Sequence, residues 1–346
     1  MVRLVDIAQR AGVSVMTVSR VLRDAPDISP ATKARIRALA TEMGYVPDVM
    51  AQGLRTRQSR LLGAVVPNVA DPVTSRVVSA LAERAHELGY ELLLHQTLNQ
   101  PEREEVCIRR LIARRVEGLF LHPVYRHATT SAACDELRQR RIQVLLLGPR
   151  TAFCQGFVNL EVEDALSAQK ATAHLIGLGH RRIAFLAGAP TSPVAVARLE
   201  GYRRGLREAG IEPDDHLVFH AGTSLEDGAK AVAQMLSEQA RPTAIQAVND
   251  LVAMGAANLL LDQRCHIPQD LSVVGFGNIT ASEFFRVPLT TVRQPKYHLG
   301  FTAMAMMQAM LKQETVSSRR LPADVVVRAS SGPPPAEAGP DAPGQV

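Results

Sequence analysis

Polar side chains able to contact an anionic polymer follow Gly12 within a short segment. Ser14, Thr17, Ser19 and Arg20 supply three hydroxyl groups and a guanidinium, which suit contact with phosphate oxygens. Ten of the 39 Lys and Arg residues but only five of the 34 Asp and Glu residues lie in the first 60 positions, so this end holds the whole excess charge of +5. A basic end joined to a neutral body predicts contact with a polyanion.

Three short helices are expected to position these side chains. Gly12 breaks the first helix, Ser14 can cap the second, and Ser29 with Pro30 starts a third that runs through Met43. The expected inward faces are Leu4, Ile7, Ala8 and Ala11 on the first helix, Val15, Val18, Val21 and Leu22 on the second, and Ile36 and Leu39 on the third, opposite Lys33, Arg35 and Arg37. Two helices around a tight turn form a helix-turn-helix, whose second helix suits the major groove of DNA. An ordinary three-helix cap on a larger domain is the alternative.

The body of the chain alternates apolar runs with segments of helical period. Strands are expected at residues 62–66, 91–95, 118–122, 144–147, 182–187, 244–248 and 272–276, and helices at residues 73–88, 102–114, 130–141, 163–178, 195–209, 225–238, 250–262 and 297–312. Such alternation predicts parallel, doubly wound sheets with helices on both faces. The number of units favours two lobes with a ligand crevice at the carboxyl ends of the strands.

The predicted fold class is therefore an N-terminal all-α helix-turn-helix domain followed by a two-lobed α/β domain. The predicted boundaries are 1–46 for the helices, 47–60 for a linker, 61–330 for the two lobes and 331–346 for a flexible tail rich in proline. We see no internal sequence repeat.

Several classes of protein lack support in the sequence. Eighteen apolar residues never run uninterrupted, so neither membrane insertion nor export is expected. The four cysteines are far apart, which favours reduced thiols in a cytoplasm over a disulfide framework or a zinc site. Nucleotide-binding, metalloprotease and nucleophile-elbow motifs are missing, so we expect neither catalytic activity nor a cofactor.

Longer stretches of the chain resemble one family of proteins. The chain contains VDIAQRAGVSVMTVSRVLRD and YVPDVMAQGLRT, then GLGHRRIAFLAG, ARLEGYRRGL, VNDLVAMGA, DLSVVGFGN and PLTTVRQP. Across residues 2–328 this series is similar to the LacI/GalR (lactose repressor and galactose repressor) family of bacterial transcription regulators. The resemblance implies a body like the periplasmic sugar-binding proteins, with a small molecule bound between the lobes.

The resemblance also assigns residues that contact DNA. Val15 and Met16 stand where members of the family place side chains that touch base edges, and both are apolar here. They suit thymine methyl groups rather than bidentate hydrogen bonds, which leaves Arg20 as the polar contact to guanine or phosphate. Packing of Val15 and Met16 inside the helix is the alternative.

Residues 48–55 resemble the hinge helix of the family. Eight residues that include Gly53 are too few for a stable helix in water, so we expect this segment to order only on DNA. The resemblance implies that Leu54 wedges into the minor groove at the central base step, while Arg55 and the arginines after it hold phosphates. A solvated basic linker is the alternative.

The resemblance places an effector site between the lobes. Arg198 matches an arginine, and Asn249 with Asp250 matches a carboxylate landmark, that usually grip the ligand in the family. Two departures are Asn278 after the GF landmark and Arg150 after the fourth strand, where neutral-sugar binders carry acids. Fewer carboxylates and an added arginine predict a more positive crevice, which suits a sugar acid or a sugar phosphate as well as a sugar.

The function predicted from these features is sequence-specific regulation of transcription, with repression the commoner outcome in the family. A homodimer would bind a pseudo-palindromic double-stranded operator in the bacterial cytoplasm, at the nucleoid, and the effector would change lobe closure and hinge folding. Pairing of dimers into tetramers is left open. The rival from another class is a cytoplasmic small-molecule-binding or metabolic protein with a non-regulatory basic N-terminus, and a second rival is a non-specific nucleoid protein.

Overall fold

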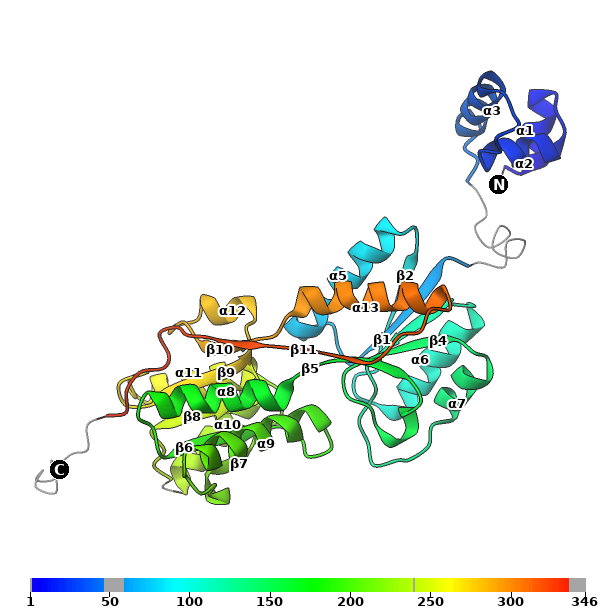
Figure 1. The fold of residues 1–346 in the computed structure, drawn as a ribbon. Coiled ribbons are helices and arrows are strands. Elements are labelled where there is room, and N and C mark those ends of the chain that lie inside the picture. The colour runs from blue at the N-terminus through cyan, green and yellow to red at the C-terminus, as the bar shows by residue number, and fades with distance from the viewer. Residues whose placement is uncertain (1, 47–58, 239, 336–346) are drawn as a thin grey trace, which may run out of the picture. The chain divides into compact units, whose positions relative to one another are not determined.

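The computed structural model describes residues 2–46, 59–238 and 240–335. The chain divides into two compact units, Met1–Ser59 and Arg60–Val346. The smaller unit is helical and the larger one contains both sheets, as the colour ramp of Figure 1 shows.

The first unit is a three-helix bundle built around a small apolar core. Its helices are α1 (Leu4–Ala11), α2 (Val15–Leu22) and α3 (Pro30–Glu42). Gly12 ends α1 with a φ of +66°, a left-handed conformation that favours glycine. The side chains of Ile7, Val18, Val21 and Ile36 are fully buried. The predicted helix-turn-helix is confirmed, with all three helices where the sequence placed them.

The first lobe of the larger unit is a parallel sheet of six strands in the order β11-β5-β4-β3-β1-β2. The strands are β1 (Leu61–Val66), β2 (Glu91–Gln96), β3 (Gly118–Leu121), β4 (Gln143–Leu147), β5 (Val158–Val162) and β11 (Arg319–Leu321). Its helices are α5 (Pro72–Glu87), α6 (Pro101–Ala113), α7 (Ala132–Gln139) and α13 (Lys296–Leu311). The register pairs Val65 with Leu121 and Leu121 with Leu146, so the carboxyl ends of β1, β3 and β4 share one edge.

The second lobe repeats this topology without any sequence repeat. Its strand order is β12-β10-β9-β8-β6-β7, parallel except for β12. The strands are β6 (Ile183–Ala187), β7 (Val218–His220), β8 (Ala244–Ala247), β9 (Ser272–Gly277), β10 (Thr290–Arg293) and β12 (Asp324–Val326). The helices are α8 (Asp164–Gly177), α9 (Pro193–Glu208), α10 (Leu225–Ser237), α11 (Asp250–Asp262) and the short α12 (Thr280–Glu283). The predicted two-lobed parallel α/β fold is therefore confirmed.

The chain passes between the two sheets three times. It crosses from β5 to α8, returns from β10 to α13, and crosses again from β11 to β12. Helix α13 follows the second lobe in sequence but packs on α5 of the first lobe (Figure 1). A Cβ at Gly300 would lie 2.6 Å from the Cβ of Ala80, so a side chain there would push the two helices apart.

The structure adds strands that the sequence did not predict, namely β5, β7, β10, β11 and β12. It also holds the start of the predicted tail. The hydroxyl group of Ser331 bonds His174 at 2.9 Å, and the Gly332 carbonyl accepts a hydrogen bond from His180 or Ser272. Hydrogen bonds to buried polar groups therefore hold Ser331 and Gly332, where apolar side chains are missing.

Candidate DNA-binding surface and effector cleft

Helix α2 begins with a side-chain cap. The Ser14 hydroxyl accepts a hydrogen bond from the Thr17 backbone N–H at 3.1 Å and lies 2.9 Å from the Thr17 hydroxyl. Both residues belong to the predicted polar row, and Ser14 is exposed. The cap fixes where the helix starts and therefore which side chains its first turn presents.

The first turn of α2 presents two apolar side chains to solvent. Val15 is 42% exposed and Met16 is 64% exposed, while Val18 and Val21 behind them are fully buried. The expectation that Val15 faces inward was wrong, because a helix of eight residues needs only part of its circumference for the core. An exposed Val–Met pair at the start of this helix suits an apolar contact in a groove.

The other two residues of the polar row differ from each other. Ser19 is only 8% exposed, and its carbonyl and hydroxyl oxygens accept hydrogen bonds from Arg23 at 3.0 and 3.3 Å. Arg20 is exposed and forms an ion pair with Asp27 in the segment between α2 and α3. Arg20 is therefore available at the surface, whereas Ser19 faces the packed side of the helix. Leu54 and Arg55, which the sequence assigned to the hinge, lie outside the described residues.

In the second lobe, Arg198 of α9 is buried, with only 7% exposure, in a fixed arrangement. Its Nε donates to Asp164 Oδ1 at 2.8 Å, its Nη2 lies 2.7 Å from the same oxygen, and its Nη1 donates to the Val248 carbonyl at 2.7 Å. The guanidinium carbon stacks 3.6 Å from the centroid of the Phe276 ring. Burial raises the pKa of Asp164, and the charge of Arg198 opposes that rise.

Asp250, at the start of α11, is also buried and bonded within the protein. It accepts hydrogen bonds from the Thr291 hydroxyl and from the Ile279 backbone N–H, the latter at 2.8 Å. Burial raises the pKa of Asp250, while Lys296 and these hydrogen bonds lower it. Lys296 donates to the Gly277 carbonyl at 2.6 Å, and burial lowers its pKa.

The two asparagines predicted to contact the effector hold local structure. The Asn249 side chain caps α11 by accepting from the Val252 N–H at 2.7 Å, and it donates to the Thr223 carbonyl at 3.1 Å. Asn278 has a positive φ of 51°, and its Oδ1 accepts from Arg328 at 2.7 Å. Each amide therefore has partners before any ligand arrives.

In the first lobe, two polar groups that the sequence did not single out follow β3. His122 Nδ1 and the Tyr125 hydroxyl are buried without a hydrogen-bond partner, and their rings meet edge to face at 5.4 Å. Burial lowers the pKa of His122 and raises that of Tyr125, which Asp164 of the second lobe raises further. Gly148, after β4, abuts this pair, since a Cβ there would lie 2.7 Å from the Tyr125 hydroxyl. Their position after a strand end is the signal that could have identified them.

An ion pair holds the loop that carries these two residues. Glu104 of α6 accepts from the Val124 N–H and from Arg126, both at 2.6 Å. The Arg126 guanidinium in turn stacks 4.1 Å from the centroid of the Phe153 ring. The loop is therefore rigidly supported although two of its polar atoms have no partner.

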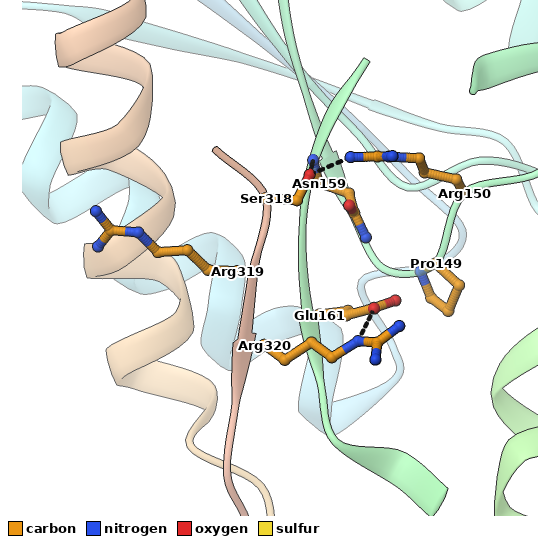
Figure 2. Close-up of a pocket in the computed structure, with 7 residues that line it drawn as sticks. All are labelled: Pro149, Arg150, Asn159, Glu161, Ser318, Arg319 and Arg320. Carbon is orange, nitrogen blue, oxygen red and sulfur yellow. Dashed lines mark hydrogen bonds and ion pairs between the residues drawn. The ribbon is translucent and has the colours of Figure 1, made fainter. Parts of the chain in front are cut away.

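Arg150 lies at a different place in the first lobe. Its side chain bonds the Ser318 hydroxyl and lines a hollow of about 620 Å³ beside Asn159, Glu161 and Arg320 (Figure 2). The structure thus keeps Arg150 with β5 and β11, while Arg198 and Asp250 belong to the second lobe.

Comparison with known proteins decides the family. The sequence pattern of bacterial regulatory proteins of the lacI family matches residues 3–48, and that of the periplasmic binding protein-like domain matches residues 172–331. The repressor CytR of Escherichia coli K12 is 30% identical over 328 residues, which cover 94% of this chain and 95% of CytR. The ribose operon repressor of the same strain is 31% identical and covers 93% of this chain and 96% of its own. The chain belongs to the LacI family.

Solved structures agree with this assignment. A lac repressor dimer bound to operator and the anti-inducer ONPF superposes with a TM-score of 0.86 at 28% identity, covering 96% of this chain and 99% of that one. A complex of the regulator CelR with cellobiose gives 0.73 at 27% identity, covering 96% and 100%. This LacI-family protein is thus a DNA-binding transcription regulator with an effector-binding domain, and its relatives are regulators rather than enzymes.

Two further observations concern other kinds of site in this LacI-family regulator. Within residues 2–46, 59–238 and 240–335, no three His, Cys, Asp or Glu side chains lie close enough together to hold a metal ion. The same part of the chain contains no helix that is both long and apolar enough to cross a membrane.

Proposed function

We propose that this regulator is a repressor that binds a pseudo-palindromic operator as a homodimer and acts without catalysis in the bacterial cytoplasm, at the nucleoid. The observation that carries the proposal is the exposed pair Val15 and Met16 at the capped start of α2, beside Arg20. An apolar pair can contact thymine methyl groups, and the arginine can contact guanine or a phosphate. The dimeric operator complex of the lac repressor, to which this chain is similar, supports the symmetric arrangement.

Selection of binding sites from random duplexes tests the DNA-binding part. A recovered palindrome would establish both half-sites and their spacing together. A protein that binds non-specifically would instead show salt-dependent affinity with little preference among sequences. Deleting residues 1–60 should abolish operator affinity and preserve ligand affinity, whereas a metabolic protein would keep all of its activity.

We further propose that a small polyhydroxyl effector binds between the lobes, against Arg198 on one side and His122 with Tyr125 on the other. The two unpartnered polar atoms of the first lobe offer hydrogen bonds that an effector can complete. Asp164 pairs with Arg198, so this part of the cleft is less positive than the sequence alone predicts. The cellobiose bound by CelR and the name of the ribose operon repressor favour a sugar, with sugar acids and sugar phosphates as the charged variants.

Thermal unfolding of the full chain with neutral sugars, sugar acids and sugar phosphates tests the class of effector. Only a compound that binds the folded protein raises the midpoint. If a compound that raises the midpoint leaves operator affinity unchanged, it is a ligand but not the effector.

A further inference from the structure

Three arginines line the hollow beside β5 and β11, namely Arg150, Arg319 and Arg320. Its volume of about 620 Å³ falls within the range of sites for small molecules. In Figure 2 the side chains of Arg150 and Arg320 enter it from opposite ends, with Asn159 between them and Pro149 facing them. Arg319 also lines the hollow, but its guanidinium points away from those of Arg150 and Arg320, as expected for successive residues of a strand.

Arg320 and Arg150 differ in whether a carboxylate pairs with the guanidinium. Arg320 donates through Nε to Glu161 at 2.5 Å, which leaves its outer nitrogens directed toward Pro149 (Figure 2). Arg150 donates to the Ser318 hydroxyl, and among the described residues no carboxylate lies within 4.0 Å to form an ion pair with it. Arg150 therefore has no counterion in the part of the chain that the structure describes.

The floor of the hollow is fixed by hydrogen bonds. Asn159 is buried, and its Nδ2 donates to the Gly148 carbonyl at 3.1 Å. The Asn159 backbone N–H donates to the Ser318 hydroxyl at 3.1 Å. These bonds link β5 both to the loop after β4 and to the segment that leads into β11, so the two arginines extend from supported backbone.

We propose that this hollow binds the phosphate group of a small phosphorylated molecule, held between Arg150 and Arg320. A guanidinium can donate two parallel hydrogen bonds to a phosphate, and two guanidiniums on opposite sides match a group with three charged oxygens. The Ser318 hydroxyl supplies a further hydrogen-bond donor. Glu161 is neutralised by Arg320, so the site keeps a net positive charge.

Chain segments connect the proposed phosphate site with the proposed effector cleft. Ser318 precedes β11 and Arg320 lies on it, and from β11 the chain makes its third crossing, to β12. On the other side of the hollow, Gly148 abuts the Tyr125 hydroxyl. A phosphate bound here ties the crossing segment to the loop that supports Tyr125. The proposed phosphate contacts, Arg150 and Arg320, are different residues from the proposed effector contacts, so the two proposals can be tested independently.

Calorimetric titration of the full chain tests the site with three probes, namely inorganic phosphate, a hexose 6-phosphate and the free hexose. The hexose phosphate should bind at millimolar concentration or tighter, and inorganic phosphate more weakly at the same site. Arg150→Gln and Arg320→Gln should each weaken hexose phosphate binding by tenfold or more, because each removes a charge-assisted contact. Arg103→Gln is the matched control, since it removes an exposed arginine of α6 in the same lobe that does not line the hollow, and it should change the Kd less than twofold.

The basic N-terminal unit also attracts anions, so a second readout must locate the bound phosphate. Hydrogen exchange should slow at residues 148–150 and 318–321 on addition of the hexose phosphate. The proposal fails if no variant affinity differs from the control, if the wild type binds neither phosphate, or if protection is confined to residues 2–46. Binding of the free hexose alone would also overturn it and would point to the cleft. Operator affinity measured without phosphate is independent of all these outcomes.

Discussion

The guanidinium of Arg198 and the carboxylate of Asp164 share two contacts, at 2.7 and 2.8 Å, in a site where both side chains are buried. The pair joins α9 to the first residue of α8, where the chain enters the second lobe. A charge at such a position needs its partner, because water cannot replace it. The pair therefore positions the arginine that the effector is proposed to contact.

Removing one member of the Arg198–Asp164 pair should destabilise the folded protein. Asp164→Asn should lower the free energy of unfolding by about 3–5 kcal/mol, since it leaves a buried guanidinium without its counterion. Urea denaturation followed by circular dichroism measures the change. The exposed pair Arg207 and Glu200 of α9 supplies the control, and Glu200→Gln should cost less than about 1 kcal/mol. Equal effects of the two substitutions would mean that the Arg198 pair is solvated.

A second ion pair lies on the proposed DNA-binding surface. Asp27 pairs with Arg20, and both side chains are about half exposed. Asp27→Asn should release the guanidinium and remove a negative charge that faces phosphates, so affinity for any duplex should rise and preference for the operator should fall. The slope of log K against log salt should steepen by about one unit. Fluorescence anisotropy with operator and random duplexes measures both quantities.

Glu42→Gln provides the comparison for Asp27→Asn. Glu42 pairs with Arg10 at 3.1 Å in the same unit, so its substitution also removes one exposed carboxylate. A preference for the operator that falls equally in both variants would show that net charge alone is responsible. A preference that rises in Asp27→Asn would contradict the idea that Asp27 positions Arg20.

The exposed thioether of Met16 leads to a test on the DNA itself. Replacing operator thymines by deoxyuridine removes only the methyl group, and should weaken binding of the wild type by about 1 kcal/mol at a contacted base. Met16→Ala should bind both duplexes equally at that base. If the variant still discriminates thymine from uracil, Met16 does not contact the methyl group, and the same comparison with Val15→Ala becomes decisive.

The sequence predicts the helices and long strands of this protein better than the contacts between distant residues. Long helices and buried strands such as β9 have a clear period, so their bounds agree with the structure within a few residues. Strands β11 and β12 have three residues each and exist because the neighbouring strands present free edges. No local pattern encodes such pairing.

The candidate site shows the same limit. Arg198 was found from its motif, but its partner Asp164 lies 34 positions away, and only the fold brings the two together. Arg150 was singled out because neutral-sugar binders of the family carry an acid at that position. The hollow that it lines also contains Arg320, which the sequence did not single out. His122 and Tyr125 follow a strand end, but the sequence does not show which polar residues at strand ends lack a hydrogen-bond partner, so they were missed.

Buried histidines should make folding stability depend on pH. Burial lowers the pKa of His122, His174 and His180 from the ordinary value of 6.5. Their neutral forms therefore stabilise the fold above pH 6.5, and this stability is lost as the pH falls through the lowered values. The unfolding midpoint should therefore fall as the pH is lowered below the ordinary histidine pKa of 6.5.

His180 allows the pH dependence to be assigned. It bonds Thr243 at 2.8 Å and the Gly332 carbonyl at 2.9 Å, so protonation disturbs the segment that holds the end of the described chain. His180→Gln should flatten the pH profile of the midpoint, while His86→Gln, at an exposed position on α5, should leave it unchanged. A profile unaffected by His180→Gln would assign the effect to the other two histidines.

The Tyr125 hydroxyl should have opposite effects on stability and on effector affinity. In the free protein it is buried without a partner, so Tyr125→Phe should leave the free energy of unfolding unchanged or raise it by about 1 kcal/mol. The same substitution removes a hydrogen bond that the effector is proposed to complete, and should weaken effector binding by about tenfold. Thermal unfolding with and without the effector measures both changes on one sample. Phe153→Leu, in the support of the same loop, should instead lower stability and affinity together, so a Tyr125→Phe variant that loses stability would place the hydroxyl in the fold rather than in the effector site.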